Sequence, residues 1–224
     1  MYKKYFKRLF DIVFSFIAIV LLSPVLLCLA ILVKKKLGSP IIFKQPRPGK
    51  DEKIFTIYKF RTMTDAKDKR GNLLSDSMRL TVFGKFLRKT SLDELPELWN
   101  IFKGDMSIVG PRPQLVKDMV FMTQDQRRRH TVRQGLTGWA QVNGRNNITW
   151  EDKLYIDLEY VDNITFLNDI KIILLTVVNV FKATGVNTEG MDTAEDLGDY
   201  LLKRNIITKN EYLKKIDIAE SLML

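Results

Sequence analysis

The chain has 224 residues, of which 46% are hydrophobic, and it carries a formal net charge of +10. This hydrophobic fraction is sufficient for a globular core and excludes a disordered chain. The charge is concentrated near the N-terminus, because residues 1–50 contain ten lysines and arginines and one acid, Asp11. This distribution argues against a nucleic-acid-binding surface over the whole chain and favours a local anionic partner. Because Cys28 is the single cysteine, an intrachain disulfide and a metal site built on several cysteines are excluded.

An apolar stretch of 22 residues without a charge, 12–33, follows Asp11. A straight helix of that length, at about 1.5 Å per residue, would just cross a bilayer core of about 30 Å. Ser23 and Pro24 lie at its midpoint, where proline bends or breaks a helix and serine can satisfy the carbonyl oxygen that proline leaves free. Basic residues flank both ends, which favours a helix that enters and leaves the membrane by the same face.

Residues 1–36 are therefore expected to form a re-entrant membrane-anchoring hairpin, hinged at Ser23 and Pro24. A simple transmembrane span and a buried helix of a soluble protein are the alternatives. A signal peptide is not expected, because no small-residue cleavage site follows the apolar stretch.

The middle of the chain, 37–190, contains short strand and helix patterns. Alternation of apolar and polar residues over 53–63 indicates a half-buried strand with Lys59 and Arg61 on one face. The elements expected in chain order are a basic turn around Gly38, Pro40, Pro46 and Pro48, this strand, a polar loop over 64–77, a short basic amphipathic helix over 79–89 and a further helix ending at Gly104.

Asp93 and Glu94 are the first candidates for chemistry. They lie near the start of the helix that ends at Gly104, where free backbone N–H groups and the helix dipole favour anions. Such carboxylates can stay ionised while they face a phosphate-bound cation. The structural alternative is that Ser91 and Glu94 form a capping box and that Asp93 is an ordinary first-turn acid.

Arg112 is the second candidate, because Pro111 and Pro113 hold it extended on a stiff turn. This rigidity suits phosphate recognition, and a structural turn with an exposed arginine is the alternative. The third candidate is the segment 133–145, whose glycines would let the backbone approach a ligand and which ends in Arg145. Its spacing matches neither a P-loop nor a dinucleotide fingerprint.

His130 lies beside three arginines, and we expect it to be a basic surface residue rather than a general base. Residues 168–185 predict an interfacial helix or a core helix, and a strand is an alternative. Residues 191–224 predict two short helices, the first opening at Asp192 and the second at a capping box formed by Thr208 and Glu211. This pair either mediates oligomer contacts or packs as a flap over the rest of the protein.

Seven motifs in this order resemble those of the bacterial sugar transferases, the small monotopic phosphoglycosyl transferases. The resemblance covers residue 1 to about residue 190. The motifs are Lys-Arg-Leu-Phe-Asp11, Ser23-Pro24, Tyr58-Lys-Phe-Arg-Thr-Met63, Ser91-Leu-Asp-Glu-Leu-Pro96, Asn100-Ile-Phe-Lys-Gly-Asp-Met-Ser107, Val109-Gly-Pro-Arg-Pro113 and Gly135-Leu-Thr-Gly-Trp-Ala-Gln-Val-Asn-Gly-Arg145.

The fold class that we expect is α/β in the sense of a helix-rich α+β chain. A re-entrant membrane helix would precede a small cytoplasmic catalytic domain, 37–190, with short strands and interfacial amphipathic helices. Residues 191–224 would add the helical tail. The resemblance also implies that the protein is monotopic on the cytoplasmic face of the bacterial inner membrane, with the inner leaflet as a partner.

The resemblance implies transfer of a sugar-1-phosphate from a UDP-sugar, with an N-acetylated aminosugar expected, to polyprenyl (undecaprenyl) phosphate. UMP would leave, and Asp93 would form a covalent phosphosugar intermediate. Mg²⁺ would bridge Asp93 and the diphosphate, and Glu94 would orient the metal or its waters. The phosphate or uridine contacts carried over from the family are Lys59, Arg88, Arg112 and Arg145.

Two other classes of protein compete with this interpretation. A non-catalytic membrane-surface adaptor or anionic-lipid-binding protein would explain the basic flanks, but it would not need the acidic pair and the arginine motifs. A nucleic-acid binder is disfavoured, because the sequence contains no RNP-type aromatic strand and no zinc-finger spacing. A homo-oligomer formed through the C-terminal tail is a further expectation.

Overall fold

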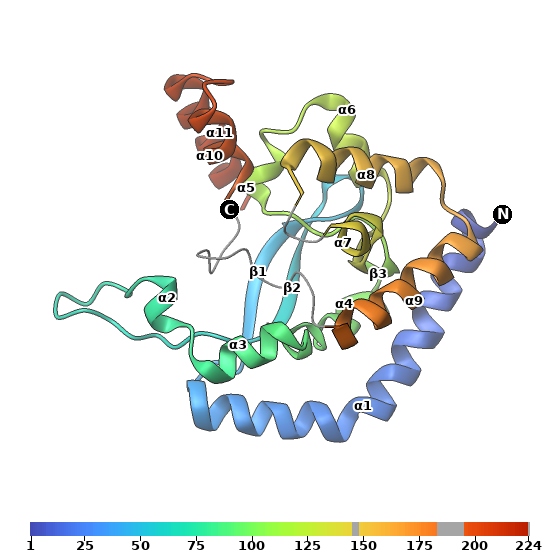
Figure 1. The fold of residues 1–224 in the computed structure, drawn as a ribbon, viewed down its shortest axis with the longest axis horizontal. Helices are drawn as coiled ribbons and strands as arrows, with labels where there is room; N and C mark the ends of the chain where they lie inside the picture. Colours follow the sequence, from blue (N-terminus) through green and yellow to red (C-terminus); the bar gives the residue numbers. More distant parts are fainter. Residues whose placement is uncertain (145–147, 183–194, 224) are drawn as a thin grey trace.

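The computed structural model describes residues 1–144, 148–182 and 195–223, and it confirms a helix-rich α+β fold with two small sheets (Figure 1). The strands are β1 (Ile42–Pro48), β2 (Ile54–Phe60), β3 (Met106–Val109) and β4 (Gln134–Thr137). The α-helices are α1 (Lys7–Leu37), α2 (Asp76–Arg79), α3 (Val82–Lys89), α4 (Glu97–Lys103), α5 (Val116–Met119), α6 (Gln124–Arg127), α7 (Trp139–Asn143), α8 (Trp150–Asp162), α9 (Phe166–Lys182), α10 (Leu197–Lys203) and α11 (Lys209–Ser221). A π-helical turn, η1 (Tyr2–Phe6), and the 3-10 turns η2 (Lys50–Glu52), η3 (Leu92–Glu94) and η4 (Arg128–Thr131) complete the list.

Strands β1 and β2 pair antiparallel, with Ile42 opposite Phe60 and Pro48 opposite Ile54. The predicted strand over 53–63 is confirmed as β2. The basic turn predicted before it is wrong over β1, because this segment is extended and paired. Two prolines are tolerated there because β1 lies in a two-stranded sheet and always has one free edge.

The second sheet pairs β3 and β4 in parallel, with Met106 opposite Gln134 and Val109 opposite Thr137. Side chains from both sheets and from α4 share one buried cluster, to which Ile57, Ile101 and Met106 contribute. This cluster fixes β2, α4 and β3 relative to one another.

Helix α1 is continuous although Pro24 lies inside it. Pro24 has no N–H to donate to the carbonyl oxygen of Val20. The Ser23 hydroxyl donates to this oxygen instead, over 2.8 Å, as the sequence predicts. Figure 1 shows that α1 is bent, so that its two halves run in different directions. The anchoring segment is thus one bent helix rather than two antiparallel helices.

Polar contacts attach the N-terminal end of α1 to the rest of the protein. The Arg8 guanidinium donates to the carbonyl oxygens of Ile101 and Phe102, at 2.6 and 2.7 Å. The buried carboxylate of Asp11 accepts a hydrogen bond from the backbone N–H of Ile108 at 2.9 Å. This end of the helix is therefore tied to α4 and β3.

Apolar packing attaches the C-terminal end of α1. Leu29, Val33 and Leu37 are buried in one cluster with Phe60 of β2 and Leu87 of α3. Both ends of α1 thus contact the same body of the protein. Ala18, Ile19 and Leu22 also pack one side of its bent middle against the cluster around Ile101, so that only the opposite side is exposed.

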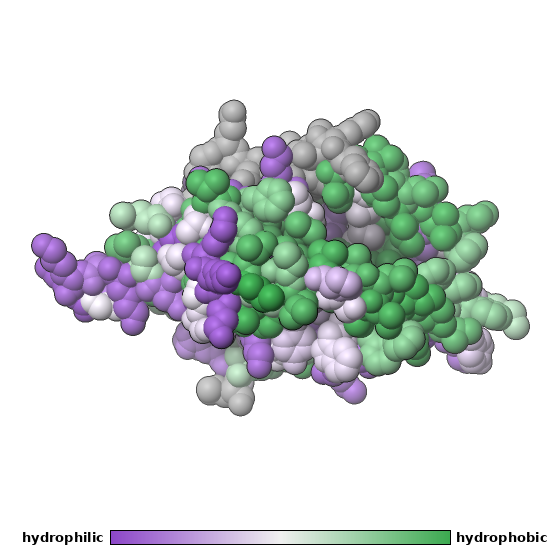
Figure 2. Space-filling view, turned by 90° about the horizontal axis from the view of Figure 1, so that it is seen from below, coloured by the Kyte–Doolittle hydropathy of each residue, from purple (hydrophilic) through white to green (hydrophobic). Residues whose placement is uncertain are grey.

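The middle of α1 presents an apolar surface (Figure 2). The window of this helix that is long and apolar enough to cross a membrane is only 11% buried, which argues against a core helix of a soluble protein. The surface is extended by Trp99 of α4, which stays 51% exposed and whose ring lies 5.7 Å from that of Phe102. A membrane association follows from this surface. Large exposed side chains of α1 include Phe14, Phe16, Leu21, Val25 and Leu27.

The remaining expectations are largely confirmed. Residues 64–77 are mostly loop, and the basic helix predicted over 79–89 is α3, which begins only at Val82 because Leu80 is extended. Gly104 caps the end of α4, as predicted, with a positive φ of 102°. The segment over 168–185 is helix α9 as far as Lys182, so the strand alternative is wrong. One side of α9 packs inward through the fully buried Ile172.

The C-terminal pair α10 and α11 packs on the rest of the protein. Leu197 and Tyr200 lie in one buried cluster with Phe121, Trp150 and Leu154. The pair therefore packs as the flap that the sequence offers as one alternative.

The sequence also predicts where each of these two helices begins. The predicted capping box of α11 is confirmed, with Glu211 accepting from the Thr208 N–H at 2.8 Å. The predicted start of the first helix at Asp192 lies outside the described residues, and α10 begins at Leu197.

Candidate active site

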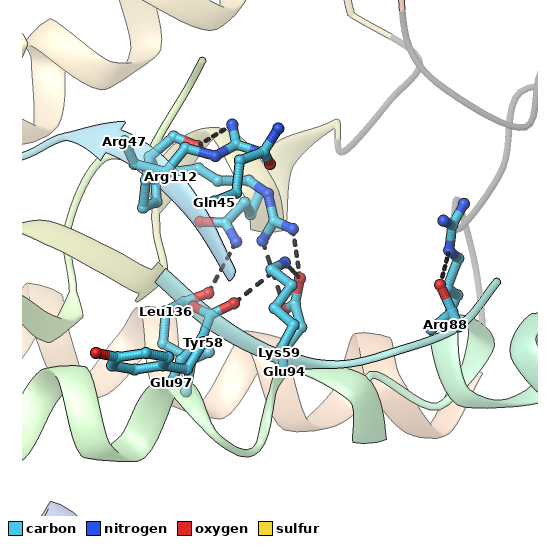
Figure 3. A network of polar contacts seen from close by, with 12 residues as sticks. Gln45, Arg47, Tyr58, Lys59, Arg88, Glu94, Glu97, Arg112 and Leu136 are labelled. Carbon is cyan, nitrogen blue, oxygen red and sulfur yellow. Dashed lines mark hydrogen bonds and ion pairs between the residues drawn. The ribbon is translucent and has the colours of Figure 1, made fainter. Parts of the chain in front are cut away.

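Glu94 is the centre of a cluster of charged side chains from four elements of the chain (Figure 3). Its Oε1 accepts a hydrogen bond from Lys59 Nζ of β2 at 2.6 Å and another from Arg112 Nη2. Its Oε2 lies 3.5 Å from Arg112 Nη1, so the guanidinium spans both carboxylate oxygens. The structure thus brings together three of the residues that the sequence proposes for the site.

The capping-box interpretation of Glu94 is wrong. Ser91 has a left-handed backbone, with φ 55°, and its side chain makes no capping hydrogen bond. Asp93 and Glu94 occupy the 3-10 turn η3, and α4 begins only at Glu97, after Pro96. Because the Glu94 carboxylate does not cap a helix, it can bind Lys59 and Arg112.

Glu97 is a third carboxylate in this cluster. It is 1% exposed, and its Oε1 lies 3.1 Å from Lys59 Nζ. Lys59 therefore stands between Glu94 and Glu97, and although burial opposes its charge, these two acids raise its pKa. Burial raises the pKa of Glu97 to about 7, with Lys59 acting in the opposite direction. Glu94 differs, because Arg112 and Lys59 outweigh its burial and hold its pKa below the usual range.

Asp93 lies next to this cluster and is 8% exposed. Burial and then the negative charge of Glu94 raise its pKa, while Lys59, Arg112 and Arg88 lower it. Among the described residues, no side chain forms a hydrogen bond or ion pair with its carboxylate. Within the described part of the chain the Asp93 oxygens are therefore unpaired, and the positive charges of Lys59, Arg112 and Arg88 act on them.

The stiff turn that carries Arg112 has its own support. The Arg112 carbonyl oxygen accepts a hydrogen bond from Arg129 Nη2 at 2.6 Å. Arg129 is fully buried and pairs with Asp157 at 2.8 Å. Gly110, just before the turn, lies so close to Gly135 that a Cβ on Gly135 would come within 2.1 Å of the Gly110 nitrogen.

The prediction that the glycines let the backbone approach a ligand is therefore wrong at two positions. The chain's own Gly110 backbone fills the space beside Gly135 and Gly138. These glycines serve the parallel pairing of β3 and β4, which places the Arg112 turn.

The sequence profile of the family described as bacterial sugar transferase matches residues 2–183. The chain belongs to the bacterial sugar transferase family. The match confirms the resemblance seen in the motifs, and it makes the protein a transferase of the phosphoglycosyl transferase type. Residues 195–223, with α10 and α11, lie beyond the matched segment.

Relatives of this bacterial sugar transferase include one of similar length and others that are longer. This chain is 50% identical over 189 residues to the uncharacterized sugar transferase EpsL of Bacillus subtilis (strain 168), and the alignment covers 84% of this chain and 94% of the relative. It is 42% identical over 186 residues to the UDP-glucose:undecaprenyl-phosphate glucose-1-phosphate transferase of Klebsiella pneumoniae, covering 79% of this chain and 40% of the relative.

A further relative is the galactosyl transferase CpsE of Streptococcus agalactiae serotype III (strain NEM316). The two are 40% identical over 193 residues, which cover 80% of this chain and 43% of the relative. The chain therefore spans less than half the length of CpsE and of the Klebsiella enzyme, and their activities are properties of longer proteins.

The predicted site residue Arg88 lies apart from Glu94, and the predicted site residue Arg145 is not among the residues that the structure describes. Arg88, at the end of α3, donates from Nε to the Thr62 hydroxyl at 3.1 Å and lies away from the Glu94 cluster in Figure 3. Arg145 lies outside the described residues. His130 is 1% exposed, so its prediction as a surface residue is wrong; burial and then the charge of Arg129 lower its pKa to about 3.

Arg47 is a residue of this cluster that the sequence analysis missed. Its Nη1 donates to the Pro113 carbonyl oxygen at 3.2 Å, and its Nη2 donates to Gln45 Oε1 at 2.6 Å. The missed signal is in the sequence, because Pro46 and Pro48 flank Arg47 in the way that prolines flank Arg112.

Glu97 was missed as well, although it lies three residues after Glu94, a spacing that brings side chains to one face of a helix. Arg129 left no such signal, since it lies within a run of three arginines and a histidine. Only the packing distinguishes it as the buried arginine of the three.

Proposed function

We propose that this bacterial sugar transferase transfers a sugar-1-phosphate from a UDP-sugar to undecaprenyl phosphate and releases UMP. The observation that carries the proposal is Asp93, a carboxylate without a partner among the described residues, whose pKa is lowered by the positive charges of Lys59, Arg112 and Arg88 against the effect of its burial. A nucleophile that must attack an anionic diphosphate needs cations of this kind around it. The name of the Klebsiella relative supports the same reaction.

The first step would form a covalent intermediate on Asp93. One carboxylate oxygen attacks the phosphorus that bears the sugar, an O–P bond forms, and the bond from that phosphorus to UMP breaks. UMP leaves with the electron pair. In the second step a phosphate oxygen of the lipid attacks the same phosphorus, and the Asp93 carboxylate leaves. The product is a lipid-linked diphosphate sugar.

Glu94 acts in this scheme as a positioning residue. Because it holds Lys59 and Arg112 by three contacts, both cations are fixed before a substrate arrives. Preorganised cations stabilise developing charge without a cost of reorganisation during the reaction. Arg112 presents a planar fork, which suits two phosphate oxygens at once.

A divalent cation fits Asp93 better than it fits Glu94. No group of three or more potential ligands that could hold a metal occurs within the described residues. Mg²⁺ is commonly bound by one or two carboxylates together with substrate phosphates, and Asp93 can provide such a carboxylate. Glu94 has its oxygens engaged by Arg112 and Lys59. When bound, Mg²⁺ would neutralise charge on the diphosphate, with Asp93 as its protein ligand.

The bent helix α1 is proposed to insert as a re-entrant segment from the cytoplasmic face of the bacterial inner membrane. One side of its middle is exposed and apolar, and both of its ends contact the same body of the protein. A helix that crossed the bilayer would separate these ends. The arrangement therefore supports entry and exit by one face.

The donor would be a UDP-sugar, and an N-acetylated aminosugar is the substrate that we propose. A panel of UDP-glucose, UDP-galactose and their N-acetylated aminosugar counterparts, mixed with undecaprenyl phosphate and Mg²⁺, tests this by UMP release. We expect the highest kcat/KM with one of the aminosugars. Faster release with a neutral hexose would overturn the choice of sugar but not the reaction.

Replacement of Asp93 tests the reaction itself. We expect Asp93→Asn to abolish turnover, because the amide keeps the shape but is a poor nucleophile and a poor Mg²⁺ ligand. In the parent, label placed in the sugar-linked phosphate should remain bound to Asp93 when the lipid acceptor is left out.

The control is Asp217→Asn, which removes an exposed carboxylate of α11 and should keep full activity. Activity of Asp93→Asn within tenfold of the parent would show that Asp93 is structural. Absence of a labelled adduct would indicate direct attack by the lipid phosphate.

Pro24→Ala tests the topology. The alanine restores the N–H that can bond to the Val20 carbonyl oxygen, so the helix should straighten and shift toward a spanning form. Cysteine labelling of Met1→Cys and Lys36→Cys in sealed vesicles measures this. In the parent both positions should label from the cytoplasmic side, and labelling from opposite sides would defeat the re-entrant topology.

A further inference from the structure

A second cluster of cations lines a cavity of about 340 Å³ beside the N-terminal end of α1. The side chains come from η1, from α1, from η2 and from the segment before β4. Among the described residues, Asp11 is the one carboxylate that lines the cavity. The cations are Lys3, Lys4, Lys7, Arg8, Lys50 and Arg133.

The carboxylates near this cavity are already engaged. Asp11 accepts hydrogen bonds from Ile108 N–H at 2.9 Å and from the Ser107 hydroxyl at 3.0 Å. Asp169, which does not line the cavity, pairs with Lys7 at 2.5 Å. The protein's own acids therefore neutralise only part of the positive charge.

Two lysines of the cavity are the most available. Lys4 is exposed and, within the described residues, its ammonium contacts only the ring of Tyr5, at 5.4 Å. Lys50 is exposed, and its nearest carboxylate, that of Asp51, lies 3.8 Å away with 61% of its side chain exposed. Cations gathered without a matching acid repel one another, and an anion in the cavity would relieve this repulsion.

The cavity is distinct from the site around Asp93. None of the residues that line it belongs to the cluster of Lys59, Asp93, Glu94, Glu97 and Arg112. It lies instead where the apolar surface of α1 begins, and the exposed Tyr5, Phe6 and Leu9 are its neighbours in the chain.

A ligand there must combine an anionic group with an apolar part that can follow this surface. A phosphate at the head of a lipid has this chemistry, and basic side chains at a membrane surface bind it. A soluble nucleotide would leave the apolar surface unused.

We propose that this cavity binds the phosphate of an anionic phospholipid and so holds the N-terminal end of α1 at the level of the head groups. The inference rests on the membrane attachment proposed above. It assigns the cavity to a lipid of the bilayer rather than to the substrate of the enzyme.

The experiment compares the full chain in phosphatidylcholine nanodiscs with and without phosphatidylglycerol. Lysine acetylation followed by mass spectrometry should show Lys4 and Lys50 protected only when phosphatidylglycerol is present, while the exposed Lys69 reacts equally in both. Equal reactivity of Lys4 and Lys50 in both nanodiscs would overturn the proposal. Protection by undecaprenyl phosphate in phosphatidylcholine, without protection by phosphatidylglycerol, would assign the cavity to the substrate and also overturn it.

A charge-matched pair of variants supplies the second readout. Lys4→Gln with Lys50→Gln should bind phosphatidylglycerol vesicles about 30-fold more weakly than the parent, at about 1 kcal/mol for each lysine. The control, Lys69→Gln with Arg70→Gln in the exposed 64–77 loop, removes the same charge and should lose less than threefold. An equal loss in both variants would indicate general attraction to the surface and would overturn a specific site.

The outcomes separate this inference from the proposed function. UMP release in detergent should be unchanged in the Lys4 and Lys50 variant, because neither residue lies in the site around Asp93. A parent that binds neither kind of vesicle would refute the membrane attachment itself. A parent that binds both kinds equally would refute only the phosphate site.

Discussion

The chain holds an arginine between two prolines twice, and the two arginines have opposite electrostatic surroundings. Arg112 pairs with Glu94, whose negative charge raises the Arg112 pKa above its usual range. Arg47 contacts a carbonyl oxygen and an amide oxygen, and burial and then the charge of Arg112 lower its pKa to about 10. The prolines stiffen both segments alike, so the difference comes from the neighbours.

The comparison shows how one local motif serves two purposes. Arg112 lies on a turn after β3, faces Glu94 and is partly exposed, with 38% of its side chain accessible. Arg47 lies in β1 and uses its guanidinium to hold the Pro113 carbonyl oxygen. Arg112 is thus placed to meet a substrate phosphate, whereas Arg47 supports the turn that carries Arg112.

Arg112→Lys should give the largest effect in this comparison. Lysine keeps the charge but not the planar pair of donors, so we expect kcat/KM to fall about ten- to hundredfold, or about 1.5 to 3 kcal/mol, with the melting temperature hardly changed. UMP release at low and physiological salt measures the loss. Arg70→Lys, in the exposed loop, is the control. A variant with parental kcat/KM at both salt concentrations would remove Arg112 from phosphate binding.

Glu97→Gln tests the charge balance around Lys59. The folded pKa of Glu97 is about 7, above the ordinary value of 4.5, so the folded state keeps a proton that the unfolded state loses between these pH values. Stability of the parent should therefore fall as the pH rises from 4.5 to 7 and level off above 7. One pKa unit corresponds to about 1.4 kcal/mol, so the rise from 4.5 to about 7 corresponds to a loss of about 3 kcal/mol, in which the opposing effect of Lys59 is already included.

Urea unfolding at several pH values, read as the difference between parent and Glu97→Gln, measures this slope. The variant should lack the slope because its amide does not titrate. Identical pH profiles would mean that Glu97 shares the ordinary pKa of an exposed acid. Glu220→Gln, on the exposed surface of α11, is the matched control.

Arg47→Lys should give the smallest effect. Lysine can keep one of the two hydrogen bonds, so we expect kcat/KM to fall less than tenfold, with the loss of one such bond worth about 1 kcal/mol. We expect the KM for the UDP-sugar to change more than kcat, because the turn would move while Arg112 keeps its charge. A larger loss than that of Arg112→Lys would reverse the comparison and place Arg47 on the substrate.

Local patterns in the sequence were sufficient for several elements. The alternation over 53–63 predicts β2, and the spacing of Thr208 and Glu211 predicts the start of α11. Ser23 and Pro24 predict the bend and the hydrogen bond that compensates it. Each of these depends on neighbours within a few residues, which a sequence displays directly.

The sequence by itself determined the family, the acidic pair, the stiff arginine turn and the basic, apolar N-terminus. Only the tertiary structure decided that Glu94 binds Lys59 and Arg112 instead of capping a helix, that Arg129 and His130 are buried, and that Gly135 packs against Gly110. Contacts of this kind join residues far apart in the chain, and their energy depends on burial and on distances between charges. A sequence names the groups that can interact, but only the packed chain selects which of them meet.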